Sequence, residues 1–264
     1  MSHYSVLVIT PKKPTMTDIE DKLAPFDENI RVAQYIQHTK EELIENTKQK
    51  ALEMKEKYEK HKANPEDTYF NEEYYLKKYP PILELIENND DVGLYLEAIE
   101  YYEEEDLDKY GNVLSTYNPN SKWDWYQIGG RFSGLFGDKF PDTIQVKDFP
   151  KFEIESEDKI KEKYPKDYKY YQDLISGKEK SLYRLSYLKE RYPTFKDYIL
   201  ESLAVTTYAV LDADNNWHEP GKMGWFASTT ATTTDEINWT NEYYNNFIMN
   251  LPKDYWLTVV DCHI

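Results

Sequence analysis

The 264-residue sequence predicts an α+β fold, with a ferredoxin-like antiparallel sheet core and large helical insertions. Three observations lead to this prediction. The chain begins with a strand-like segment and a helix-like segment, and it ends with two strand-like segments, a helix-like one and a last strand. Long, charged, helix-like stretches separate these two parts. We therefore expect one sheet assembled from both ends of the sequence.

The first strand is predicted over residues 3–10, HYSVLVIT, because this run is rich in β-branched residues and is closed by Pro11. The next segment, TMTDIEDKLAPF, predicts a helix. Either Thr15 or Thr17 can cap its start, acidic side chains occupy its first turn, and Pro25 marks its end.

Residues 39–110 predict a first helical insertion. It opens with Thr39-x-x-Glu42, the pattern of a capping box, and continues with apolar residues near helical spacing. Pro80 and Pro81 are expected to break the next helix of this region. The acidic clusters that follow are typical of a solvated helix face.

Residues 155–203 predict a second helical insertion. Gly177 is expected to end one of its helices and Pro193 another. The many tyrosines of this region lie mostly at helix-like spacing, which favours packing between helices over a cofactor site.

From residue 204 onwards the pattern returns to strands around one helix. An apolar strand, a turn rich in Asp and Asn at residues 212–216 and a second strand-like arm predict a hairpin. A helix is predicted through DEINWTNEYYNNFIMNL, ending before Pro252. The last segment, YWLTVVDCHI, is apolar enough for a strand buried on both faces, and we expect it beside the first strand.

These elements predict a single decorated domain. Its core comprises residues 1–38, 111–154 and 204–264, and the helical insertions comprise residues 39–110 and 155–203. The sequence shows no internal repeat of about 20 to 50 residues and no Gly/Ser-rich linker, either of which would indicate separate units.

An excess of acidic residues restricts the classes of partner. The chain has 32 basic and 49 acidic residues, for a net charge of −17. This charge repels phosphate backbones, so we expect no general nucleic-acid binding, whereas a basic protein partner is compatible with it. The single cysteine, Cys262, fits a reducing compartment. No secretory signal or bilayer-spanning run is visible, so we expect a cytoplasmic protein without membrane association.

Two short stretches concentrate the glycines and tryptophans. Six of the nine glycines and four of the six tryptophans lie in residues 121–137, SKWDWYQIGGRFSGLFG, and residues 217–226, WHEPGKMGWF. Glycine is needed where φ is positive or where another group approaches closely, and aromatic walls suit a flat ligand. Arg131, beside a glycine pair, is suited to hold a phosphate or carboxylate. Neither stretch matches the dinucleotide-binding or phosphate-loop fingerprint.

The same composition also has a purely structural explanation, because tryptophans bury large areas and glycines let a strand turn sharply. The sequence leaves both interpretations open. In the binding interpretation, a small anionic, nucleotide-like ligand is enclosed without any cofactor. The residues of this predicted site are Trp123, Trp125, Tyr126, Gly129, Gly130, Arg131, His218, Lys222 and Trp225.

Two histidines and an aspartate form a second candidate cluster. Asp261 and His263 project from the same face of the last strand, and His3 meets them if the terminal strands pair. Such a cluster is able to bind a divalent metal or to pair an acid with a base. Because a histidine at a strand end is more often structural, these residues are only secondary metal candidates.

The signatures of known catalytic classes are incomplete. His3-Tyr4-Ser5 matches one H-x-[ST] half of a two-histidine phosphoesterase, whose mechanism needs a second histidine. The final DCHI does not repeat this motif, which argues against that class. The sequence has no G-x-S-x-G nucleophile elbow, and Cys262 lies in an apolar strand, where a thiol is normally inert.

The combination of NPNSKWDWYQIGGRFSGLF, WHEPGKMGWF and LTVVDCHI resembles a family of uncharacterised proteins of bacteria and tailed bacteriophages. The resemblance covers the first strand, residues 117–137 and residues 207–264. Its specific elements are W-D-W-Y-x-I-G-G-R-[FW], G-K-M-G-W and a C-terminal V-D-C-H. It implies that these motifs form one site, without implying an activity. For a phage protein of this kind we expect a counter-defence role in the host cytoplasm, through a signalling nucleotide or an effector protein.

The sequence thus predicts a soluble, non-catalytic binding protein that sequesters a small anionic, nucleotide-like ligand. The alternative is an acidic inhibitor that binds a host protein through its helical insertions. A third hypothesis is a metal-assisted hydrolase that uses His3, Asp261 and His263. The sequence leaves open whether the protein is an enzyme, which ligand it binds and whether it forms a homo-oligomer.

Overall fold

The computed structural model describes residues 2–65, 70–137, 139–150, 156–223 and 228–264. The chain divides into two compact units, one of Met1–Ile30 with Asn118–Ile264 and one of Arg31–Tyr117. The predicted α+β class is confirmed, because a mostly antiparallel sheet is combined with separate helices. Within the described ranges, no helix is both long enough and apolar enough to cross a membrane.

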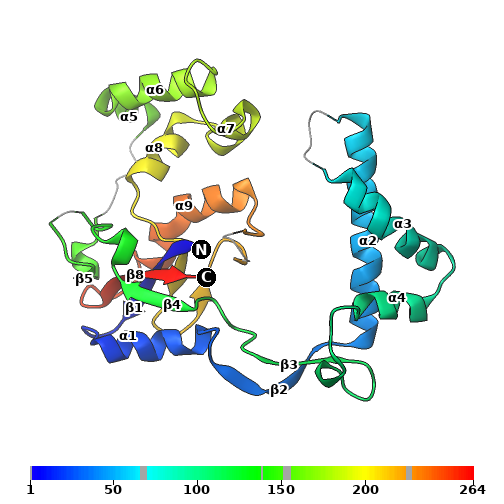
Figure 1. Cartoon of the computed structure of the whole chain (residues 1–264). Helices are drawn as coiled ribbons and strands as arrows, with labels where there is room; N and C mark the ends of the chain where they lie inside the picture. The colour runs from blue at the N-terminus through cyan, green and yellow to red at the C-terminus, as the bar shows by residue number, and fades with distance from the viewer. Residues whose placement is uncertain (1, 66–69, 138, 151–155, 224–227) are drawn as a thin grey trace. The chain divides into compact units, whose positions relative to one another are not determined.

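The first unit is built around two long central strands. β1 (His3–Thr10) pairs antiparallel with β8 (Trp256–His263), with His3 opposite His263. Nearly every residue of both strands is buried, as their continuous apolar runs indicate. The prediction that the first and last strands are neighbours is confirmed, and the two ends of the chain lie side by side (Figure 1).

Four shorter strands of the described chain complete this sheet, in the order β4-β8-β1-β6-β7 with β5 also beside β8. They are β4 (Trp125–Ile128), β5 (Thr143–Gln145), β6 (Ala209–Leu211) and β7 (Trp217–His218). The predicted hairpin is present between β6 and β7. In its turn, the Asp212 carboxylate accepts hydrogen bonds from the backbone N–H groups of Asp214 and Asn216.

Helices cover both faces of the sheet (Figure 1). α1 (Met16–Leu23) packs Ile19 and Leu23 on one face, and α9 (Thr233–Phe247) packs Tyr243 on the other. In both helices a threonine before the first turn and an aspartate three residues later exchange hydrogen bonds. This capping box satisfies backbone N–H groups that would otherwise lack a partner.

The capping residue of α1 is Thr15 and not Thr17. The Thr15 hydroxyl accepts a hydrogen bond from the Asp18 N–H, and the Asp18 carboxylate accepts one from the Thr15 N–H. Thr17 also has an acid, Glu20, three residues later, so the local pattern fits both candidates and the structure selects Thr15.

The elements β1, α1, β6, β7, α9 and β8 follow the predicted β-α-β-β-α-β order. One feature departs from an antiparallel ferredoxin-like sheet, because β1 lies directly beside β6 and parallel to it. In a split βαβ arrangement, another strand separates the two parallel strands. Here β7 lies outside β6, at the edge. The apolar pattern of a strand records its burial and does not identify its neighbour.

Residues 156–203 belong to the first unit and form the expected helices. Gly177, with φ of +76°, follows the second of these helices, and Pro193 follows the third. Aromatic side chains pack the helices together; the rings of Tyr171 and Phe195, for example, have centroids 5.6 Å apart. The helices are α5 (Glu157–Lys163), α6 (Pro165–Ile175), α7 (Leu185–Arg191) and α8 (Phe195–Leu203).

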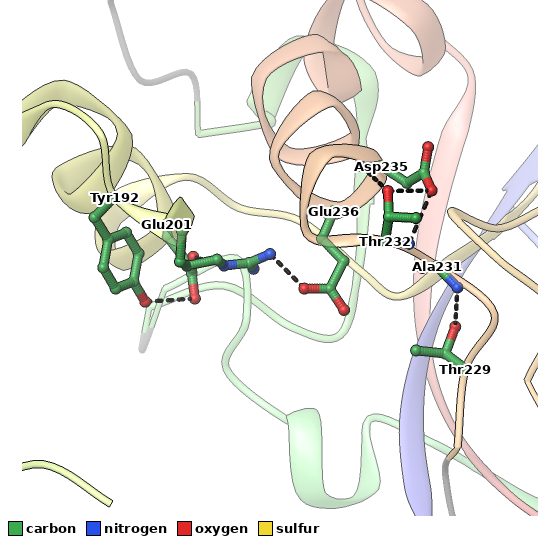
Figure 2. A network of polar contacts seen from close by, with 8 residues as sticks. Tyr192, Glu201, Thr229, Ala231, Thr232, Asp235 and Glu236 are labelled. Atoms are coloured by element: carbon green, nitrogen blue, oxygen red, sulfur yellow. Dashed lines mark hydrogen bonds and ion pairs between the residues drawn. The ribbon is translucent and has the colours of Figure 1, made fainter. Parts of the chain in front are cut away.

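Arg191 joins these helices to α9. Its guanidinium forms ion pairs with Glu201 of α8, at 2.9 Å from Nε, and with Glu236 of α9. The Tyr192 hydroxyl donates to the other oxygen of Glu201, and burial together with that carboxylate raises the pKa of Tyr192 to about 12. Figure 2 shows Tyr192 and Glu201 on one side of this contact and Glu236 on the other. The Arg191 side chain is only 12% exposed, whereas Glu201 and Glu236 are 39% and 31% exposed, so the guanidinium is shielded from water while its partners remain partly solvated.

The second unit is wider than the predicted insertion 39–110, because a two-stranded ribbon of β2 (Arg31–His38) and β3 (Val113–Tyr117) belongs to it. The chain is therefore organised as two compact units, and the second contains the whole predicted insertion 39–110. The helices of this unit pack around buried side chains that include Tyr75 and Tyr79. They are α2 (Lys40–Ala63), α3 (Glu72–Glu87) and α4 (Asp91–Ala98).

The capping box predicted at the start of α2 is present, but the break predicted at Pro80 and Pro81 is wrong. α3 continues through both prolines. A proline cannot bond the carbonyl four residues earlier, which here belongs to Leu76 or Lys77. These residues and both prolines are exposed, so water can satisfy the freed carbonyl groups. Tyr79 stays buried on the other side and holds the helix in place.

The first prediction concerns the Arg191 contact. Replacing Arg191 with methionine keeps an apolar stem but leaves Glu201 and Glu236 without their cation. We expect the free energy of unfolding to fall by about 2 kcal/mol, measured by urea denaturation. Lys189→Met, an exposed position on the same helix, is the control and should change it by less than about 0.5 kcal/mol. Equal losses in the two variants would show that the contact contributes nothing.

The second prediction concerns acid stability of the β6–β7 hairpin. Burial alone raises the pKa of Asp212, but hydrogen bonds from His218 and Asn216 outweigh this effect and hold the pKa below its ordinary value. Such a carboxylate stabilises the fold above about pH 4, and the contribution disappears as the pH falls further. Between about pH 5 and 3, the melting temperature should therefore fall more steeply for the native chain than for Asp212→Asn. Asp214→Asn, in the same turn, should follow the native chain.

Candidate functional site

Two histidines, each paired with an aspartate, meet at one end of the sheet. The rings of His3 and His263 have centroids 5.1 Å apart. His3 Nδ1 lies 2.8 Å from Asp261 Oδ1, and His263 Nδ1 lies 2.5 Å from Asp124 Oδ1. Each imidazole is therefore held through Nδ1 by its own carboxylate, and neither of these bonds uses Nε2.

Strand pairing brings these residues together. His3, His263 and Trp125 lie in one row across β1, β8 and β4. Asp261 lies two residues before His263 and thus on the same face of β8. Asp124 directly precedes β4, where its backbone N–H donates to the His263 carbonyl at 3.0 Å. The structure therefore brings His3, Asp261 and His263 together in the way that pairing of the terminal strands predicts.

The glycine pair lets a neighbouring loop close on Asp261. Gly129 and Gly130 have φ of +68° and +53°, which few other residues adopt. A β-carbon on Gly130 would lie only 2.5 Å from Asp261 Oδ2. Without it, this oxygen accepts a hydrogen bond from the Arg131 backbone N–H at 2.9 Å. Asp261 thus holds His3 with one oxygen and the loop with the other.

Asp142 holds the same loop from its other side. A β-carbon on Gly129 would lie 2.1 Å from Asp142 Oδ2. The carboxylate instead accepts hydrogen bonds from the Ser133 hydroxyl at 3.0 Å and the Gly134 N–H at 3.1 Å. Its backbone carbonyl accepts one from the Val259 N–H of β8. The glycine pair Gly129-Gly130 is therefore explained by two carboxylates that fill the space of the missing side chains.

An open hollow with a volume of about 470 Å³ lies beside the paired histidines. Its lining residues are His3, Asp124, Trp125, Arg131 and His263. Trp125 is 48% exposed, and its ring meets that of His3 edge-on with centroids 6.2 Å apart. The side chain of Arg131 is also exposed. The volume lies in the range of small-molecule binding sites.

One atom of this cluster lacks a partner. His263 is only 9% exposed, and its Nε2 is buried without a hydrogen bond to any described residue. Buried polar atoms are nearly always paired, because an unpaired one costs about 1–3 kcal/mol. His263 also lines the hollow, so a small movement of the ring or its neighbours that exposes Nε2 would let a ligand atom bond it and remove this cost.

The structure separates the aromatic residues of the predicted enclosure. Trp125 and Arg131 line the hollow, whereas Trp123 and Tyr126 lie on the opposite face of the sheet and pack together in the core. Successive strand residues face opposite sides, which separates Trp125 from Tyr126. A bend at Asp124 interrupts the alternation and turns Trp123 inward, where it is 6% exposed.

The second Trp/Gly stretch contributes no described residue to the hollow. His218 is on β7, two strands away from β1, where its Nε2 lies 2.8 Å from Asp212 Oδ2. Lys222 is exposed and does not line the hollow. Trp225 lies outside the described residues. The predicted enclosure by both stretches is therefore not formed by His218 and Lys222, because the hairpin carries them to the other side of β1.

Asp124 and Asp142 are the site residues that sequence reasoning missed. Asp124 lies between two tryptophans, and their size directs attention to the rings. A usable signal exists, because an aspartate inside an aromatic, strand-like stretch needs a partner for its charge. The identity of that partner, His263, depends on strand register, which local sequence does not contain.

The cluster is arranged for proton transfer. Among the described residues, no group of three or more His, Cys, Asp or Glu side chains has the geometry to hold a metal ion. Both oxygens of Asp261 are already engaged, by His3 and by the Arg131 N–H. Two carboxylate-oriented imidazoles side by side supply a proton acceptor and a proton donor.

The Cys262 thiol is buried, which raises its pKa and keeps it unreactive.

Comparisons of the chain with protein-family models, curated protein sequences and solved structures give no match.

The third prediction tests the glycine loop. Gly130→Ala would force the Asp261 carboxylate away from the Arg131 N–H, in addition to straining a residue with positive φ. We expect a loss of about 2–3 kcal/mol in the free energy of unfolding. Gly177→Ala is the matched control: its φ is +76°, but a β-carbon there would meet nothing closer than 3.5 Å. It should lose only the strain component, about 1 kcal/mol. Equal losses would contradict the close packing of Asp261.

Proposed function

We propose that the protein cleaves small phosphate esters by acid–base catalysis, with His3 and His263 as the proton-transfer pair. The observation that carries this proposal is the pair of imidazoles, each held through Nδ1 by a separate carboxylate, beside a hollow. The buried, unpaired Nε2 of His263 supports it independently, because this atom needs a ligand partner. The proposal keeps the small anionic ligand that the sequence predicts and adds a reaction.

In the proposed reaction, water attacks phosphorus while a P–O ester bond breaks. Asp124 accepts the Nδ1 proton of His263, which makes Nε2 the acceptor atom; once a small movement of the ring exposes Nε2 to the hollow, it takes a proton from the water. His3 donates its Nε2 proton to the leaving oxygen. Asp261 stabilises the charged His3 ring, as the aspartate does in a Ser-His-Asp triad. One ring gains a proton and the other loses one, so exchange with solvent restores both.

Arg131 supplies the positive charge that a phosphate requires. Arg131 lines the hollow together with both histidines, and its side chain is exposed. A guanidinium can hold two phosphate oxygens at once and stabilise the negative charge that develops as the nucleophile attacks. The backbone N–H of the same residue is fixed by Asp261 at 2.9 Å, which sets the position of the loop relative to His3.

The arrangement answers the objection that the sequence raises against a two-histidine phosphoesterase. The second histidine comes from Asp261-x-His263 on the antiparallel neighbour of β1, and not from a second H-x-[ST] motif. The Ser5 hydroxyl of the single H-x-[ST] motif accepts a hydrogen bond from the Tyr208 N–H, so its role here is in the sheet. Proton transfer requires two oriented imidazoles and does not require a repeated motif.

The fourth prediction tests the reaction with p-nitrophenyl phosphate and bis(p-nitrophenyl) phosphate. We expect release of p-nitrophenol with a rate maximum between acid and alkaline declines, because one ring must be neutral and the other protonated. His3→Ala and His263→Ala should each lower kcat by about 100-fold or more. The control is His218→Ala, which also removes a carboxylate-bound histidine but lies outside the hollow. Circular dichroism confirms that each variant is folded.

Unchanged rates in both site variants, or an equal loss in His218→Ala, would contradict the catalytic proposal. Binding of an anionic ligand without turnover would instead favour the second candidate, which is sequestration of such a ligand in the cytoplasm. The exposed Trp125 ring favours this candidate, because a flat ligand can stack on it without any reaction. A phage counter-defence role remains a prediction under either candidate.

A further inference from the structure

The hollow carries little surplus positive charge. Among the described residues that line it, Arg131 is the permanent cation, and Asp124 is an anion. Asp261, beneath His3, is a second anion. When one imidazole is protonated, as the proposed reaction requires, its charge and that of Arg131 are balanced by the two carboxylates. A substrate with several negative charges would therefore enter a site that has no excess positive charge to neutralise it. The net charge of the chain, −17, would repel such a substrate as well.

This balance favours a substrate with a single negative charge. A phosphate diester carries one, whereas a phosphate monoester carries about 1.5 to 2 at neutral pH, and nucleoside di- and triphosphates carry more. The two carboxylates are bonded to the Nδ1 atoms of the rings. The Arg131 guanidinium can bind both non-ester oxygens of a diester at once, and this single cation matches the single charge of the diester. A polyanion would need further cations, and the described lining has none besides Arg131 and the histidines.

Trp125 supplies a flat apolar surface at the same place. It is opposite His263 in the β4–β8 pairing, about 5 Å away by strand spacing. The residue is 48% exposed although its ring contacts His3 edge-on. An exposed aromatic ring next to an anion site is the arrangement that stacking of a nucleobase requires.

We infer that the substrate is a nucleoside phosphodiester, cyclic or linear, whose base stacks on Trp125 and whose phosphate lies between Arg131 and the two histidines. The inference rests on the proposed function. The oxygen of water bonds to phosphorus, one of its protons goes to His263, and the ester oxygen leaves as an alcohol with a proton from His3. The product is a phosphate monoester with more negative charge than the substrate, so the same charge balance that admits the diester favours release of the product.

The fifth prediction uses isothermal titration calorimetry on the full chain with 2′,3′-cyclic AMP, 3′,5′-cyclic AMP, AMP, ADP and ATP at one ionic strength. At least one cyclic diester should bind at least tenfold more tightly than AMP, with ATP weakest. Arg131→Gln should weaken diester binding at least tenfold. Trp125→Leu should weaken it at least fivefold, and Trp125→Phe should restore most of the loss. Lys147→Gln, an exposed cation outside the hollow, is the matched control and should leave binding unchanged.

An affinity that rises from AMP to ATP would overturn the inference, as would binding of a diester that is insensitive to Trp125→Leu, or no binding of either cyclic nucleotide. The two proposals fail in different ways. Hydrolysis of bis(p-nitrophenyl) phosphate that requires both histidines, without binding of any nucleoside diester, contradicts only the inferred substrate. Tight binding of a cyclic nucleotide without hydrolysis of any diester contradicts the catalytic proposal and retains the inferred ligand class.

Discussion

The buried carboxylate of Asp261 is the contact on which the site depends. It is 1% exposed, and a carboxylate so far from water must have partners for its charge. One oxygen bonds His3 on the first strand, and the other bonds the Arg131 N–H in the glycine loop. A single side chain of β8 therefore fixes both an imidazole and the loop that carries the guanidinium. If this carboxylate were moved, the positions of His3 and of the Arg131 loop relative to each other would no longer be fixed.

Much of the sheet could be predicted from the sequence, because burial and helix capping are local signals. The apolar run of β1, the hairpin turn at Asp212 and the strand-like end of the chain each determine their own structure within a few residues. The parallel neighbour of β1 could not be predicted, since which strands pair depends on the packing of the whole sheet. The continuous helix through Pro80 and Pro81 was also inaccessible, because it depends on which side of the helix faces water.

The residues of the site also divide into those that local sequence places and those that it does not. Alternation along β8, together with pairing of the terminal strands, is enough to place His3, Asp261 and His263 on one face. The aromatic residues were harder to assign, because a bend at Asp124 turns Trp123 into the core while Trp125 faces the hollow. Side-chain size therefore indicated a site in the correct segment, and only backbone direction shows which rings belong to it.

The pairing of the first and last strands also determines when the site can exist. His3 is made first, and its neighbours in the cluster, Asp261 and His263, are made more than 250 residues later, as the 258-residue separation of the His3–Asp261 contact requires. Contacts so distant in sequence form late, because a long chain segment must first be closed. A nascent chain on the ribosome therefore holds an incomplete pair of histidines until β8 has emerged, and any activity of the site begins only with the folded sheet.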